Sequence, residues 1–146
     1  MLSQTAEYAL RAVLYLAERP AGELVRVGEM AGALRIPQNY LSKTLHALVR
    51  VGVLASGRGP TGGFQLAREP DRLPLFEVVS PFDQLGRRRR CLLGRPECTD
   101  RHACAAHEAW KQTSDQVARF FRQTTVADLR ERNAVTPTTK PHRRSS

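Results

Sequence analysis

Apolar residues recur at three- and four-residue steps over the first seventeen positions, which is the spacing of a helix with one buried face. These positions are Ala6, Ala9, Leu10, Val13, Leu14 and Ala17. Ser3 can cap the start of this helix, and Pro20-Ala21-Gly22 is typical of its end. The pattern predicts an amphipathic helix that buries one face against other elements.

Two shorter helical stretches follow, at residues 27–35 (VGEMAGALR) and 38–52 (QNYLSKTLHALVRVG). In the second stretch Leu41, Leu45 and Leu48 line one side. Pro37 suits the first turn of that helix and Gly52 suits its exit. Two helices joined by a short break after a longer helix are typical of a helix-turn-helix.

Next, VLAS (53–56) and GFQLAR (63–68) flank the glycine-rich GRGPTG (57–62), which predicts two short strands joined as a hairpin. The GRGPTGG stretch lacks the Gly-Lys-Ser/Thr ending of a nucleotide-binding loop and leads into a strand, so that function is excluded. The expected fold class is mainly α with a small β-hairpin wing, a winged helix-turn-helix domain over residues 1–82. An unrelated three-helix packing with an added hairpin is the alternative.

The rest of the chain predicts a short apolar helix stopped by Pro81, a loop over residues 83–99 and a helix over 100–130 capped by Thr99 or Asp100. The long helix repeats at coiled-coil steps through Ala106, Trp110, Thr113, Val117, Phe120 and Thr124. We expect Ala106, Trp110, Val117 and Phe120 to pair with a second copy of the chain. Packing on the chain's own first helix is the alternative. Residues 131–146 are expected to be a disordered basic tail.

The charge balance favours nucleic acid as a partner. The chain has 23 basic and 14 acidic residues, a net charge of +9 and a pI near 10.5. No apolar run is long enough to span a bilayer, so a cytoplasmic location without a membrane partner is expected. No acid/base pair or nucleophile constellation appears, so we expect no enzyme activity and no small-molecule substrate.

Candidate DNA contacts lie at the start of the second short helix and at the hairpin tip. With the leucines turned inward, Gln38, Asn39, Ser42 and Lys43 face outward, where they can reach base edges or phosphates in the major groove of double-stranded DNA. Arg58 stands between glycines and can enter a minor groove. Each of these residues can also be an ordinary solvated side chain.

All three cysteines, Cys91, Cys98 and Cys104, lie within residues 87–107, and His107 follows the last one by three positions. Three thiolates plus one further donor form a metal-binding set. The spacing is wider than that of zinc knuckles and suits an iron–sulfur cluster. A zinc site and direct oxidation sensing by the thiols remain the alternatives.

The opening SQTAEYALRAVLYLA, the wing GRGPTGGFQLA and the three cysteines before a long helix resemble the bacterial Rrf-two family of winged-helix repressors, over roughly residues 1 to 130. The resemblance implies a homodimer whose long helices cross, two winged domains on a palindromic operator, and a cluster bound by Cys91, Cys98 and Cys104. Iron–sulfur status, redox state and nitric oxide are the signals it implies.

The resemblance also implies two candidates for the fourth ligand. In the IscR-like branch a histidine three residues after the last cysteine completes a 2Fe-2S site, which nominates His107. In the NsrR-like branch a carboxylate from the partner's first helix completes a 4Fe-4S site, which nominates Glu7. The six-residue gap between Cys91 and Cys98 is one longer than the IscR-like spacing, and Ser42 stands where that branch has an acidic residue.

Overall fold

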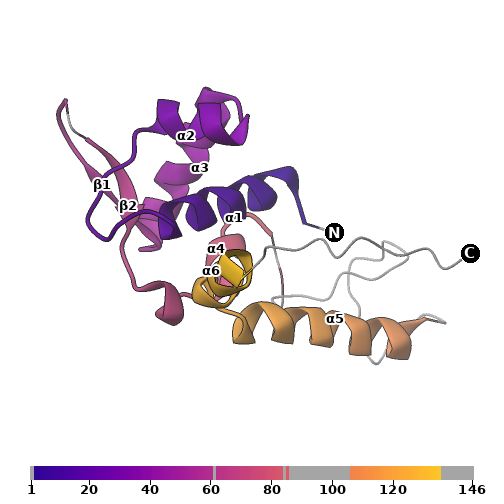
Figure 1. The fold of residues 1–146 in the computed structure, drawn as a ribbon. Helices are drawn as coiled ribbons and strands as arrows, with labels where there is room; N and C mark the ends of the chain where they lie inside the picture. The colour runs from indigo at the N-terminus through magenta and orange to yellow at the C-terminus, as the bar shows by residue number, and fades with distance from the viewer. Residues whose placement is uncertain (1, 61, 84, 86–105, 136–146) are drawn as a thin grey trace, which may run out of the picture.

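The described part of the chain, residues 2–60, 62–83, 85 and 106–135 of a computed structural model, is a group of packed helices with one β-hairpin projecting from its side (Figure 1). In chain order the elements are α1 (Gln4–Ala17), α2 (Val27–Leu34), α3 (Gln38–Arg50), β1 (Leu54–Gly57), β2 (Gly63–Leu66), the 3-10 turn η1 (Pro70–Arg72), α4 (Leu75–Val79), α5 (His107–Gln123) and α6 (Val126–Val135). The expected fold class, mainly α with a hairpin wing, is confirmed.

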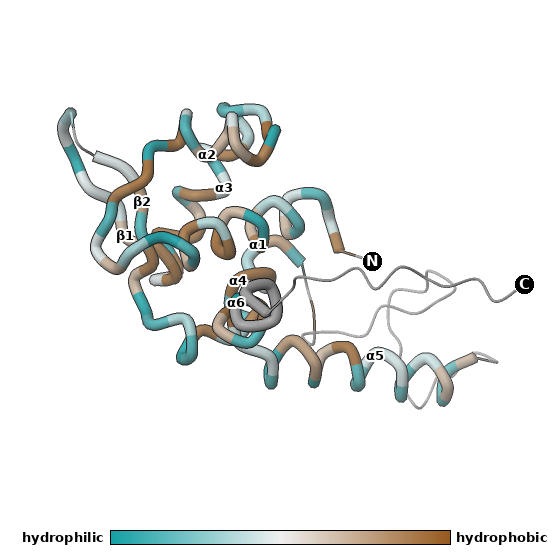
Figure 2. The backbone as a smooth tube through the Cα atoms, in the orientation of Figure 1, coloured by the Kyte–Doolittle hydropathy of each residue, from teal (hydrophilic) through white to brown (hydrophobic). Residues whose placement is uncertain are grey.

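Helix α1 is the element around which the others pack, since it contacts α2, α3, α4, α6 and β2. Its start is fixed by Ser3, whose Oγ accepts a hydrogen bond from the Ala6 N–H at 3.1 Å. Small residues at Ala6, Ala9 and Ala12 are fully buried and let neighbouring helices approach closely. In Figure 2 the hydrophobic segments gather where α1, α3 and α4 meet.

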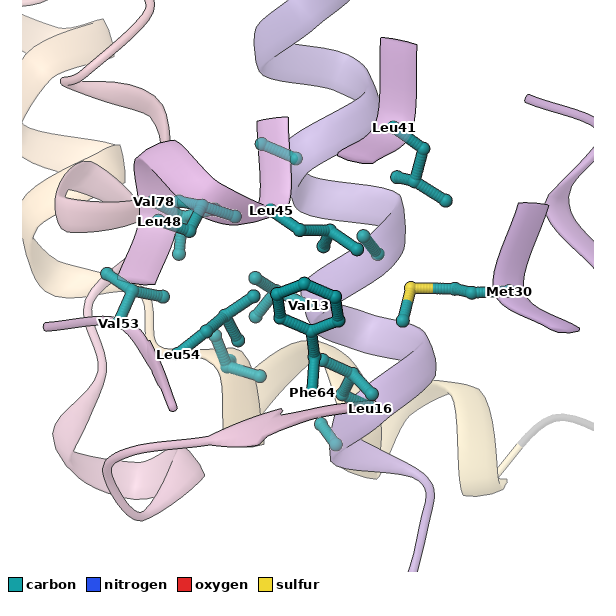
Figure 3. Close-up of a cluster of buried hydrophobic side chains, with 14 of the residues drawn as sticks. Val13, Leu16, Met30, Leu41, Leu45, Leu48, Val53, Leu54, Phe64 and Val78 are labelled. Atoms are coloured by element: carbon teal, nitrogen blue, oxygen red, sulfur yellow. The ribbon is translucent and has the colours of Figure 1, made fainter. Parts of the chain in front are cut away.

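The turn between α2 and α3 is short because Arg35 adopts a left-handed conformation, with φ 56°, that ends α2. Ile36 is buried and its N–H donates to the Ala31 carbonyl at 3.1 Å. In α3, Leu41, Leu45 and Leu48 are fully buried, and Figure 3 shows them in one cluster with Val13 of α1 and Phe64 of β2. The core therefore fixes which side of α3 faces outward.

The wing is antiparallel, with Leu54 opposite Leu66 and Gly57 opposite Gly63. Phe64 also exchanges backbone hydrogen bonds with Val25, at 2.9 and 2.8 Å, which ties the hairpin to the segment before α2. A Cβ at Gly63 would stand 2.5 Å from the Val25 carbonyl oxygen, so this contact requires glycine.

The expected helix over residues 100–130 is wrong in its extent. The helix α5 begins at His107 and ends at Gln123, and α6 follows as a separate helix that continues to Val135, into the expected tail. Thr124 is extended because its carbonyl accepts from the Leu75 N–H, while the Val126 N–H donates to the Leu73 carbonyl, both at 2.9 Å. Of the loop expected at 83–99, only Asp83 and Leu85 are among the described residues.

A reciprocal cap starts α6. The Asp128 N–H donates to Thr125 Oγ1 at 3.3 Å, and the Thr125 N–H donates to Asp128 Oδ2 at 2.8 Å. This pair has the geometry of a capping box, which satisfies two otherwise unpaired backbone donors. The sequence signal for this cap is Thr-x-x-Asp at residues 125–128, and it marks the start of a helix that the apolar periodicity did not predict.

Helix α6 packs on α1. Val126 is fully buried, and Arg130 Nη1 donates to the Ala17 carbonyl at the end of α1 at 3.1 Å. Helix α5 contacts α4, burying Phe121, and the Arg122 guanidinium lies 4.8 Å from the centre of the Phe76 ring.

We predict that Thr125→Ala lowers the free energy of unfolding by about 1 kcal/mol, because the Asp128 N–H loses its cap. Urea denaturation followed by circular dichroism measures this change. Thr113→Ala is the matched control, since Thr113 is exposed within α5 and its hydroxyl only bonds back to the Ala109 carbonyl. Equal losses in the two variants would show that the cap adds nothing.

Candidate nucleic-acid interface and cysteine segment

The outward face of α3 carries four exposed side chains at steps of four, three and four residues: Asn39, Lys43, His46 and Arg50. At 100° per residue they lie within about 60° of one another around the helix axis. We call them the α3 polar row. Because the leucines on the other side are fully buried, the row is the part of α3 available to a partner.

Two of the predicted contact residues, Asn39 and Lys43, belong to this row. Gln38 is exposed at the first position of α3, and Ser42 is half-buried beside the row. His46 and Arg50 were not among the predicted contacts, because only the start of this helix was expected to reach base edges. The spacing that identified the leucine side of α3 also identifies this opposite row.

A groove of about 270 Å³ lies next to the start of α3, lined by Thr5, Tyr40, Lys43, Thr44 and Phe82. Tyr40 is 53% exposed and its ring stands edge-on to Tyr8, with the ring centres 6.3 Å apart. Immediately after Phe82, Asp83 Oδ2 accepts from the Ser3 N–H at 2.9 Å. The residues that lead into the cysteine segment are therefore bonded to the N-cap residue of α1 and share a groove with the start of α3.

The wing tip presents Arg58 as an exposed cation. The turn beside it closes through a hydrogen bond from the Gly62 N–H to the Gly59 carbonyl at 2.9 Å, with Gly59 at φ 92°. Within the described ranges no hydrogen bond or ion pair engages the Arg58 side chain. The guanidinium is therefore available to a phosphate or a groove.

The structure does not test the predicted ligand set. Cys91, Cys98 and Cys104 lie outside the described residues, and the residues that are described contain no group of three potential metal ligands. His107 is the first residue of α5 and is only 6% exposed. Glu7 is exposed in the first turn of α1.

The residues expected to pair with a second copy occupy different environments on α5. Phe120 is 52% exposed, whereas its neighbour Phe121 is buried against the core. The two rings stand edge-on to each other, with their centres 5.3 Å apart. Val117 packs partly on the core, and Ala106 and Trp110 are half-buried. Figure 1 shows the first turns of α5 extending away from the other helices. No described helix is both long and apolar enough to cross a membrane.

A helix-turn-helix with an attached two-stranded wing, an exposed polar row on its second helix and a basic wing tip defines the winged-helix class of DNA-binding proteins. Residues 2–132 match the Rrf2 family, described as iron-dependent transcriptional regulators. The chain belongs to this family.

Individual relatives agree with this assignment. The chain is 37% identical to a putative HTH-type transcriptional regulator of Aquifex aeolicus over 88% of this chain and 90% of the relative. It is 28% identical to the transcriptional regulator IscR of Cronobacter sakazakii over 88% of this chain and 78% of the relative. The structure of CymR, the global cysteine regulator of B. subtilis, superimposes with a TM-score of 0.75 at 23% identity and covers 90% of this chain and 97% of that chain.

The chain is thus a transcriptional regulator and not an enzyme, as the sequence indicated. Winged-helix regulators of this family bind DNA.

We predict that Arg58→Ala weakens binding to duplex DNA about tenfold, because a charge-assisted contact is lost, and that the fold is unchanged. Fluorescence anisotropy over a salt series measures both the affinity and its salt dependence. Arg72→Ala is the control, since this exposed arginine lies in η1, which packs against α6. If Arg58→Ala and Arg72→Ala bind alike, the wing tip does not contact DNA.

Proposed function

We propose that this regulator is a repressor that binds a palindromic operator as a homodimer and responds to the state of an iron–sulfur cluster. The observation that carries the DNA-binding part is the α3 polar row, which the core leaves exposed beside a basic wing. The net charge of +9 supports association with a polyanion. Gln38, Asn39, Ser42 and Lys43 contact the major groove, and Arg58 contacts the minor groove.

The cluster part of the proposal is supported by donor chemistry. Thiolates are the ligands of iron–sulfur clusters, and a histidine nitrogen replaces a thiolate in some of them. Cys91, Cys98 and Cys104 supply three sulfurs, and the nearly buried His107 supplies a nitrogen close to Cys104 in sequence. This set fits a 2Fe-2S cluster. Glu7 in place of His107 fits the 4Fe-4S alternative. When bound, the cluster would supply a redox-active centre. Its oxidation, nitrosylation or loss would change the bonds between the centre and the residues that hold it.

Coupling to DNA is supported by the contacts at the start of the cysteine segment. Asp83 holds the N-cap residue of α1, and Phe82 shares a groove with Tyr40 and Lys43 at the start of α3. A change in the position of this segment therefore acts on both helices. In a dimer, such a change alters the spacing of the two α3 helices. The cluster shifts the equilibrium between the two spacings only by the difference in its affinity for them.

The homodimer is supported by α5. This helix presents Phe120 as one of the most exposed large apolar side chains of the described chain, and its first turns extend beyond the other helices. Trp110 and Val117 lie earlier on the same helix, and Ala106 is its N-cap residue. A second copy of α5 covers these side chains in a twofold arrangement, which matches a palindromic operator.

A second candidate function uses the thiols directly, as an oxidation sensor or a zinc site without a cluster. It is favoured by the count of three cysteines, which leaves the thiolate set incomplete for an all-cysteine cluster site.

We predict that Cys98→Ala abolishes the iron and sulfide content of protein prepared without oxygen while the dimer persists, because the cluster loses a ligand and α5 keeps its apolar face. Iron and sulfide analysis, visible absorbance and light scattering measure these properties. His102→Ala is the matched control, a potential donor in the same segment that is outside the proposed set. Full iron content in Cys98→Ala would discard the ligand set. A colourless wild-type protein containing zinc would support the second candidate.

We predict that His107→Ala changes the electron paramagnetic resonance spectrum of the reduced cluster, whereas Glu7→Ala leaves it unchanged, because a ligand nitrogen is lost only in the first variant. Circular dichroism in the far ultraviolet confirms that both variants are folded. A spectrum altered only by Glu7→Ala would assign the fourth ligand to that carboxylate instead.

A further inference from the structure

His46, in the middle of the α3 polar row, is held in place although it is exposed. Its Nδ1 lies 2.7 Å from the Ser42 carbonyl oxygen one turn earlier in α3. Its ring stands edge-on to Phe64 of β2, with ring centres 5.4 Å apart and an interplanar angle of 87°. The imidazole therefore bridges the recognition helix and the wing, and its orientation is fixed from both sides.

The contact with Ser42 determines which ring nitrogen carries the proton. A carbonyl oxygen only accepts hydrogen bonds, so Nδ1 must be the donor. In the neutral imidazole Nε2 is then an acceptor. Within the part of the chain that the structure describes, Nε2 has no protein hydrogen-bond partner.

The neighbours of His46 in the row give this acceptor a distinct role. Lys43 and Arg50 lie one turn away on either side, and both side chains carry only donors. Donors suit phosphates and the acceptor edge of guanine, whereas a base amino group needs an acceptor. In the major groove such amino groups are adenine N6 and cytosine N4.

We propose that His46 is a specificity-determining residue whose Nε2 accepts a hydrogen bond from a base amino group in the major groove. This inference rests on the proposed function, since it requires α3 to lie in that groove. Phe64 is a positioning residue in this arrangement, because it sets the plane of the ring and does not touch the base.

The test begins with selection of operators from a random duplex library by the full-length protein and by His46→Ala. The wild type is expected to specify one base pair in each half-site that becomes unrestricted in the variant. At that position the amino group is then removed chemically, with purine in place of adenine or 2-pyrimidinone in place of cytosine. The wild type should lose about fivefold in affinity on this replacement, the effect of one hydrogen bond.

His46→Phe is the matched variant, because it keeps an aromatic edge against Phe64 and removes both nitrogens. It and His46→Ala are expected to bind the modified and unmodified duplexes equally. Arg50→Ala is the control in the same row, and it should weaken binding to both duplexes while retaining the fivefold difference. Thermal melting confirms that the variants are folded.

Three results would overturn the inference. The first is an operator preference that His46→Ala leaves unchanged. The second is a wild-type affinity that does not change when the amino group is removed. The third is a fivefold difference retained by His46→Phe, which would show that the ring contributes its shape and not a nitrogen acceptor. If the wild type selects no duplex sequence at all, the proposed function fails as well, so the two failures are distinguishable.

Discussion

Burial of Leu41, Leu45 and Leu48 against α1 is the constraint on which the rest of the winged domain depends. Each buried leucine stabilises the fold by about 2 kcal/mol, so α3 cannot rotate about its axis without exposing them. The same contact that holds α3 in the core therefore determines which side chains are presented to a partner. The wing is attached to the same core through Phe64, whose ring contacts His46 and whose backbone pairs with Val25.

Periodicity predicted the winged half of the molecule because each of its elements repeats over several turns or is bounded by a strong local signal. The Ser3 cap, the leucine side of α3 and the glycine-rich hairpin all appear in the structure. The C-terminal half was predicted less well because the seam with coiled-coil steps runs up to Thr124 and gives no sign that backbone pairing with Leu75 ends the helix there. That pairing joins residues about fifty positions apart, and no local pattern contains it.

The candidate site residues also differ in how much of their placement could be predicted from the sequence. Asn39 and Lys43 could be placed from sequence because their exposure follows from the inward direction of the leucines on α3, and Arg58 could be placed because it lies between glycines at the tip of a hairpin. His46 could have been found by continuing the same count, but its contact with Phe64 depends on how the wing folds back on α3. The cysteine ligands were identified by residue type and clustering alone, which define a donor set but give no geometry.

The pairing of Thr124 and Thr125 with the segment before α4 has a mechanical consequence for α5. The helix is attached to the winged domain at its C-terminal end, through backbone bonds and the buried Phe121, while His107 lies at the opposite end. Seventeen residues at 1.5 Å each make a rod of about 25 Å. A tilt of about 5° at Thr124 therefore displaces the far end by about 2 Å, so α5 converts a small angular change at its attachment into a movement as large as a metal–ligand bond.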